Sequence, residues 1–127
     1  MSKRTVLVVD DDQAVADALV AMFILAGFSA SAAYDAESAL ESARLIPPCF
    51  LIAEVVLPGM NGVDLASAVQ HIAPDCRVLI CSRVTTEATL PLFSLQSGCK
   101  IVFLSKPIHP SELLVHVTAL LNDRIAA

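Results

Sequence analysis

Carboxylate side chains follow two short apolar runs of the sequence. The aspartates of residues 10–12 come directly after Thr5–Val9, and Glu54 ends a second such run. Clustered carboxylates repel one another unless a cation lies among them, and Mg²⁺ binds a few carboxylate oxygens together with carbonyl groups and water. Asp10, Asp11 and Glu54 are therefore candidate magnesium ligands.

The acidic run also suits a structural role. Negative side chains favour the N-terminus of a helix, where unpaired backbone N–H groups point outward. Asp12 stands just before a helical pattern and is the residue we expect to cap that helix. For Asp10 and Asp11 the metal-binding interpretation is the stronger one.

A hydroxyl and an ammonium group follow two further apolar runs. Ser82 comes after Val78–Cys81, and Lys106 comes shortly after Ile101–Leu104. A hydroxyl and an ammonium that face carboxylates suggest that the site handles phosphate. The sequence has no glycine-rich phosphate loop after its first apolar run and no nucleophile elbow, which argues against nucleotide-binding enzymes and serine hydrolases.

Apolar runs alternate with helical patterns along the chain, and this alternation predicts how those residues are positioned. Thr5–Val9, Phe50–Ala53 and Val78–Cys81 are apolar without a polar face, which is typical of strands buried on both sides. Phe28–Tyr34 and Ile101–Leu104 are weaker strands and suit the edges of a sheet. The pattern predicts a five-stranded parallel sheet, whose ligands bind at the carboxyl ends of the strands.

Five helical patterns connect or follow these strands. The fourth contains Pro91, which removes a backbone donor, so we expect that helix to begin or bend there. The first pattern stops at Gly27, a residue suited to a helix C-terminus. The predicted helices are Val15–Ala26, Ala36–Leu45, Val63–Ile72, Glu87–Ser97 and Ser111–Asn122.

Length and composition limit the class of protein. With 127 residues, 56% of them hydrophobic and 17% charged, the chain suits one globular domain. The net charge of −5 and the lack of a basic cluster disfavour direct nucleic-acid binding. Apolar stretches are too short for a membrane span or a signal peptide, so we expect a cytoplasmic protein. The four cysteines lack zinc or redox spacing and are expected to be buried thiols.

With these features, the chain resembles the receiver domain of bacterial two-component response regulators. The resemblance covers residues 4–122, nearly the whole chain, and four motifs occur in the family's order. They are VLVVDDD (Val6–Asp12), EVVLPGMNG (Glu54–Gly62), LICS (Leu79–Ser82) and FLSKP (Phe103–Pro107).

The resemblance implies a flavodoxin-like, doubly wound (βα)5 fold with strand order 2-1-3-4-5. It also implies a single receiver domain over residues 1–127, with no output domain. In the family an acidic pair binds Mg²⁺, an aspartate ending the third strand accepts a phosphoryl group from a histidine kinase, and a lysine and a hydroxyl hold that group. Asp10, Asp11, Lys106 and Ser82 match these roles.

Three features depart from the family pattern. Glu54 stands where the phosphoacceptor aspartate belongs, Arg83 replaces a small residue after the switch hydroxyl, and Gly98–Lys106 is one residue longer than usual. Glutamate displaces the carboxylate by roughly an ångström, and a misplacement of that size can cost about a hundredfold in group transfer. We therefore expect slow or absent phosphorylation and, at most, weak Mg²⁺ binding.

Two interpretations of Glu54 remain open beside genuine phosphorylation. As a mimic, its carboxylate bonds to Ser82 or Lys106 as a phosphoryl group would; as part of a quiet scaffold, it only pairs with Arg83 or Lys106. Phe103 resembles the family's aromatic switch, or it is an ordinary packed strand residue.

The expected activity is protein docking rather than catalysis. The surface would be the face of the fourth helix, fifth strand and fifth helix, and the partner a histidine kinase or a separate output protein. A Mg²⁺-dependent phosphoester hydrolase is a less favoured alternative.

Overall fold

Five short apolar segments form one parallel sheet at the centre of the structure, a computed structural model that describes residues 4–82, 101–105 and 109–126. The strands are β1 (Thr5–Val9), β2 (Ser29–Ala33), β3 (Phe50–Glu54), β4 (Arg77–Ser82) and β5 (Ile101–Ser105). Their order is β2-β1-β3-β4-β5, and each neighbouring pair is parallel. The predicted order is confirmed, with β2 and β5 at the edges.

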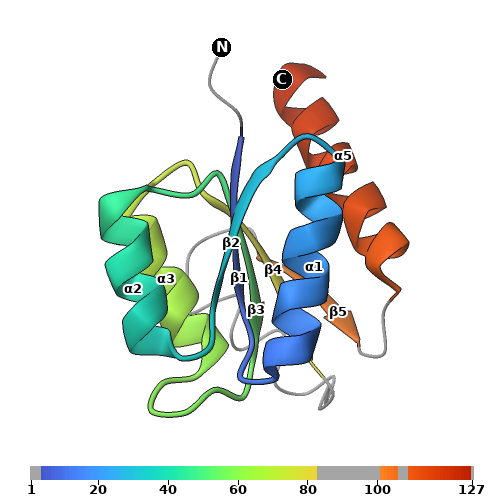
Figure 1. The fold of residues 1–127 in the computed structure, drawn as a ribbon. Coiled ribbons are helices and arrows are strands. Elements are labelled where there is room, and N and C mark those ends of the chain that lie inside the picture. Colours follow the sequence, from blue (N-terminus) through green and yellow to red (C-terminus); the bar gives the residue numbers. More distant parts are fainter. Residues whose placement is uncertain (1–3, 83–100, 106–108, 127) are drawn as a thin grey trace.

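Helices cover both faces of the sheet (Figure 1). α1 (Gln13–Leu25) and α5 (Pro110–Ala126) lie on one face, while α2 (Ala36–Leu45) and α3 (Gly62–Ile72) lie on the other. α1 starts directly after Asp12, the predicted cap, and two residues before the predicted apolar pattern begins at Val15. α3 and α5 each start one residue before the predicted position, and α5 continues four residues beyond Asn122. The predicted fourth helix, Glu87–Ser97, lies outside the described residues.

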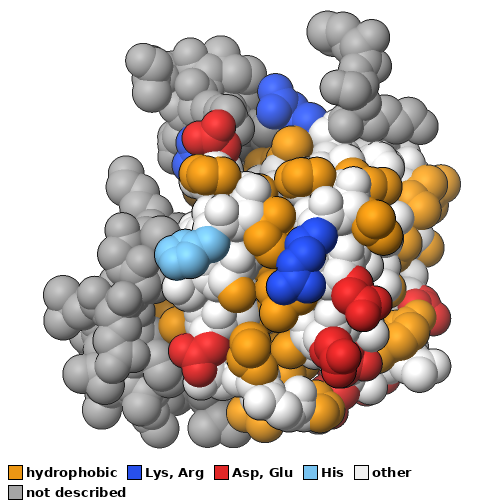
Figure 2. All heavy atoms as spheres, turned by 90° about the vertical axis from the view of Figure 1, so that its left-hand side faces the viewer, with side chains coloured by type: hydrophobic (Ala, Val, Ile, Leu, Met, Phe, Trp, Pro, Cys, Tyr) orange, Lys and Arg blue, Asp and Glu red, His pale blue; other side chains and the backbone are white. Residues whose placement is uncertain are grey.

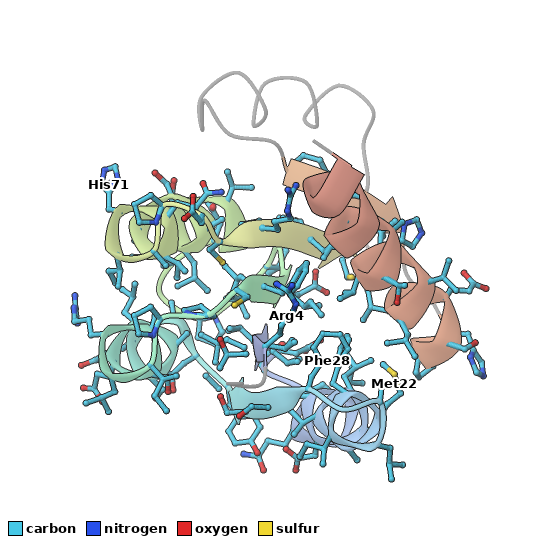
Figure 3. The ribbon with its side chains drawn as sticks, turned by 90° about the horizontal axis from the view of Figure 1, so that it is seen from above. Arg4, Met22, Phe28 and His71 are labelled. Carbon is cyan, nitrogen blue, oxygen red and sulfur yellow. The ribbon has the colours of Figure 1, made fainter. Side chains whose placement is uncertain are left out.

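Alternate strand residues supply two cores, one on each face of the sheet. The α1/α5 core contains Val6, Val8 and Phe50, and Phe28 extends it with an edge-on ring contact to Phe50 at a centroid distance of 6.5 Å. Figure 3 shows Phe28 on this side of the sheet, close to α1. The α2/α3 core contains the intervening strand residues, Leu7 among them. This burial on both faces explains why β1, β3 and β4 read as unbroken apolar runs.

Polar side chains fix the starts of three helices. Asp12 caps α1 by accepting a hydrogen bond from the Val15 N–H at 3.3 Å, as predicted. Asp35 does the same for α2 at 2.7 Å, and Asn61 caps α3. The end of α1 is also as predicted, because Gly27 adopts φ of +99°, a conformation that other residues rarely take.

The outer face of α2 and α3 carries mixed side chains. Figure 2 shows apolar groups between isolated acidic and basic ones, and the basic groups do not gather into a patch on this face. In the described part of the chain, no helix is both long and apolar enough to span a membrane.

Candidate functional site

Two carboxylates lie side by side at the carboxyl ends of neighbouring strands. Val9 of β1 is in register with Ala53 of β3, so the next residues, Asp10 and Glu54, stand next to each other. Each is only 3% exposed, and they are the only buried charged residues in the described part of the chain. A buried carboxylate is costly unless a partner stabilises its charge, so this placement marks the crevice as a candidate site.

Asp10 is oriented by the backbone of the acidic run. Its Oδ1 accepts a hydrogen bond from the Asp12 N–H at 2.9 Å. Asp11 and Asp12 are exposed, and the side chain of Asp12 is engaged as the α1 cap. The structure therefore separates the three aspartates into one buried residue, one exposed residue and one helix cap.

The donor chemistry of the site fits Mg²⁺ with few protein ligands. Carboxylate oxygens of Asp10, Asp11 and Glu54 are hard ligands of the kind that Mg²⁺ prefers. Within residues 4–82, 101–105 and 109–126, however, no three His, Cys, Asp or Glu side chains group closely enough to hold a metal ion. Mg²⁺ retains several waters and needs only one or two carboxylates, so a sparse site remains chemically suitable.

The Glu54 carboxylate reaches back to the chain that follows it. Its Oε2 accepts a hydrogen bond from the N–H of Val55 at 2.7 Å. The Val55 carbonyl in turn accepts from the N–H of Gly62, the first residue of α3, also at 2.7 Å. The expected partners of Glu54 were Ser82, Arg83 and Lys106, and the bond from Val55 was not predicted because a backbone donor leaves no trace in residue types.

Gly62 lies so close to the backbone of Glu54 that only glycine fits at this position. A Cβ atom on Gly62 would lie 2.1 Å from the Glu54 carbonyl oxygen, far inside van der Waals contact. The start of α3 therefore lies directly against the backbone of the site. Gly62, the last residue of the EVVLPGMNG motif, is the sequence signal for this approach.

The remaining predicted residues follow the next strands of the sheet. Ser82 is the last residue of β4, one position beyond Cys81, which is in register with Glu54. Phe103 lies in the middle of β5, opposite Ile80, and is half-buried against the α2/α3 core. Arg83 and Lys106 lie outside the described residues. The backbone thus brings Asp10, Glu54 and Ser82 to the same end of three adjacent strands.

A cavity of about 510 Å³ opens beside the two carboxylates. Its floor is formed by apolar residues of β1 and β3, and its walls by Leu19 of α1 and Leu113 of α5, while Asp10 and Glu54 lie at its acidic edge. The helical spacing of the wall residues predicts only that they face the core. A hollow between two correctly predicted helices is not visible in such a pattern.

The histidines take no part in the described site. His71 is exposed and points outward from α3 (Figure 3). His109 precedes α5, and its Nδ1 lies 2.7 Å from the Ser111 hydroxyl at the start of that helix. His116 is exposed on α5.

Comparison with known proteins assigns the family. Residues 6–118 match the family model of the response regulator receiver domain. The chain belongs to the response regulator receiver domain family, and the resemblance inferred from its motifs is confirmed at this level.

Individual relatives agree with this assignment. The chain is 32% identical over 124 residues to the transcriptional regulatory protein PrrA of Mycobacterium leprae, covering 98% of this chain and 52% of that protein. It is 29% identical over 115 residues to the chemotaxis protein CheY of Thermotoga maritima, covering 90% of this chain and 93% of CheY. A CheY-like receiver domain from Methanospirillum hungatei superposes with a TM-score of 0.88 at 22% identity, covering 98% of both chains.

The extent of these matches differs between relatives. The DNA-binding response regulator MtrA of Mycolicibacterium paratuberculosis is 29% identical over 120 residues, which are 94% of this chain and 52% of MtrA. The chain thus spans about half the length of MtrA and PrrA but nearly all of CheY.

Proposed function

We propose that this receiver domain acts by docking another protein and does not require phosphoryl transfer. The observation that carries the proposal is the buried carboxylate of Glu54 at the end of β3, beside Asp10. Glutamate reaches one methylene further than aspartate, so its oxygens are displaced by roughly an ångström from the position suited to in-line attack. The direct test is exposure to a small phosphodonor with Mg²⁺, which should leave the chain unmodified.

The Val55 contact supports a carboxylate that is already satisfied without phosphate. A hydrogen bond from a backbone N–H to a carboxylate is charge-assisted and stronger than one between neutral groups. The Oε2 atom that makes this bond is less available as a nucleophile, because its lone pair is engaged. A receiver that accepts a phosphoryl group from a histidine kinase is the alternative, since the chain matches the family model of the response regulator receiver domain.

Two forms of the docking proposal differ in what Glu54 does to the output face. In the mimic, Glu54 also draws Ser82 toward it and Phe103 turns inward, which holds the face of β5, α5 and the predicted fourth helix in an active-like form. In the quiet scaffold, Glu54 only neutralises Lys106 or Arg83. The site can stabilise one form only through its differential interaction with the two forms.

The position of Phe103 distinguishes the two forms. In the mimic, Glu54→Ala and Glu54→Gln should let the Phe103 ring sample an exposed rotamer, measured by aromatic side-chain NMR. The variant Asp35→Asn is a control, because Asp35 caps α2 and lies outside the site. Identical Phe103 signals in all four proteins contradict the mimic and leave the quiet scaffold.

The partner and setting follow from the same proposal. A docking receiver has a protein partner, either a histidine kinase or an output protein, and both would place the chain in the cytoplasm. We propose that residues 1–127 form a single receiver domain. Asp10, Asp11 and Glu54 would hold Mg²⁺ weakly; one related structure, from Burkholderia pseudomallei, contains a phosphorylated aspartic acid and a calcium ion.

A hydrolase is disfavoured because Glu54 occupies the place of a nucleophile and already bonds to Val55. An assay with generic phosphoesters and Mg²⁺ should give no hydrolysis above that of the Asp10→Asn variant. Turnover that depends on Asp10 would replace the docking proposal with an enzymatic one.

A further inference from the structure

The Glu54 carboxylate and the start of α3 both bond to the backbone of Val55. The Val55 N–H donates to Glu54 Oε2 and the Val55 carbonyl accepts from the Gly62 N–H, both at 2.7 Å. The side chain of Val55 is half-buried against the α2/α3 core. The two peptide groups on either side of Val55 are therefore each held by a hydrogen bond.

The absence of a side chain at Gly62 allows the start of α3 to lie against the end of β3. The 2.1 Å separation between a Cβ at Gly62 and the Glu54 carbonyl oxygen means that any other residue would push α3 away from β3. Such a shift would pull the Gly62 N–H from the Val55 carbonyl and would also displace the Glu54–Val55 peptide, whose carbonyl lies against Gly62 and whose N–H donates to Glu54 Oε2. Asn61 holds the same helix start from the other side, because its side chain accepts from the Asp64 N–H at 2.8 Å.

We infer that Gly62 and the Glu54–Val55 peptide are the positioning elements of Glu54, holding its carboxylate folded back onto the β3–α3 connection. Gly62 touches no reacting group and acts through this peptide. The charge on Glu54 is thereby coupled to the β3–α3 segment, residues 55–61, in which Val56 is 64% exposed. This positioning of Glu54 concerns the residue on which the proposed function rests, but it depends only on the hydrogen bond from the Val55 N–H.

The contact can be measured in the intact chain by two NMR experiments. Scalar coupling across the hydrogen bond should connect the Val55 nitrogen with the Glu54 carboxyl carbon. Hydrogen exchange of the Val55 amide should be about ten- to a hundredfold faster in Glu54→Ala, which corresponds to the loss of a hydrogen bond to a charged acceptor. Glu54→Gln keeps an acceptor oxygen and should restore part of the protection.

Asp35→Ala is the matched control. It removes another carboxylate that accepts from a backbone N–H at 2.7 Å, at the start of α2, and should speed exchange at Ser38 while leaving Val55 unchanged. Gly62→Ala should abolish the coupling and speed Val55 exchange; if that variant does not fold, the Glu54 variants still decide.

Absence of the coupling together with unchanged Val55 exchange in Glu54→Ala would overturn the inference. This outcome is separate from the fate of the proposed function. Val55 amide exchange can depend on Glu54 while the Phe103 signals do not change, a result that contradicts the mimic and supports the positioning of Glu54. Phosphorylation of Glu54 would contradict the proposed function but not its positioning.

Discussion

Asp10 and Glu54 are each 3% exposed and stand on adjacent strand ends, so each affects the charge balance of the other. Two carboxylates brought together out of water favour a nearby cation. Each of them accepts a hydrogen bond from a backbone N–H group, Asp10 from Asp12 and Glu54 from Val55. Backbone donors reduce the need for a metal ion.

Magnesium binding is therefore expected to be weak. Isothermal titration calorimetry with Mg²⁺ should show no micromolar site, because one oxygen of each buried carboxylate is already hydrogen-bonded and Mg²⁺ demands near-octahedral geometry. Asp10→Asn should weaken what binding exists, whereas Asp35→Asn should not. Lys106→Ala should strengthen binding by removing a competing cation, or else destabilise the fold. Micromolar affinity in the unmodified protein contradicts this account.

Cysteine reactivity provides a second expectation for single residues. Burial raises the pKa of the Cys76 thiol to about 12, with a smaller contribution from the nearby Cys49. The thiolate is the nucleophile in alkylation, so half-buried Cys49 should react with iodoacetamide before Cys76 and Cys81, which are both buried. Peptide mass mapping at mildly alkaline pH gives the order. Modification of Cys76 first would show that this part of the core opens readily.

The same raised pKa predicts how stability changes with pH. The unfolded chain loses the Cys76 proton near the ordinary value of 9.0, while the folded protein keeps it until about 12. The unfolded state then binds fewer protons than the folded state, so the free energy of unfolding falls as pH rises from about 9 toward 12. Urea denaturation across this range should show a shallower fall in Cys76→Ala than in the unmodified protein. An equal slope would mean that other groups cause the whole effect.

At the scale of helices and strands, the N-terminal caps determine where the helices begin. The Asp35 carboxylate accepts from the Ser38 N–H at 2.7 Å and starts α2. Asp35→Ala should lower the free energy of unfolding by about 1 kcal/mol, the usual effect of losing an N-terminal cap. Chemical denaturation measures it, with Glu37→Ala, an exposed acid in the first turn of α2, as a control of smaller effect. Equal losses would show that charge, rather than the cap, supports α2.

The central position of β1, β3 and β4 was predictable from the sequence, because strands buried on both faces leave apolar runs. The order of the strands was predicted only from the family resemblance. The Asp12 cap and the end of α1 at Gly27 were predictable from local chemistry. The hydrogen bond from Val55 to Glu54 was not predictable from the sequence, because its donor is a backbone N–H whose direction depends on how α3 packs against β3. The cavity beside Asp10 depends on the separation of α1 and α5, which periodicity does not encode.

For the whole molecule, the two cores hold the strand ends in register. Leu113 of α5 is fully buried, lies in the α1/α5 core and lines the cavity beside the site. Leu113→Ala should reduce the free energy of unfolding by about 2–5 kcal/mol, the range for removing a buried leucine side chain. Val115→Ala, on the same helix and 67% exposed, should change it by less than about 0.5 kcal/mol. Similar losses in urea denaturation would mean that α5 does not pack as described.

A receiver fold with Glu54 in place of the phosphoacceptor should not take up a phosphoryl group. Intact-mass spectrometry after incubation with acetyl phosphate and Mg²⁺ tests it directly. The unmodified protein should keep its mass, Glu54→Asp should gain little, and Glu54→Asp combined with Arg83→Ala should gain more than the sum of the single variants, because both residues bear on one site. A stoichiometric, acid-stable and base-labile phosphoryl group mapped to Glu54 in the unmodified protein would contradict the account.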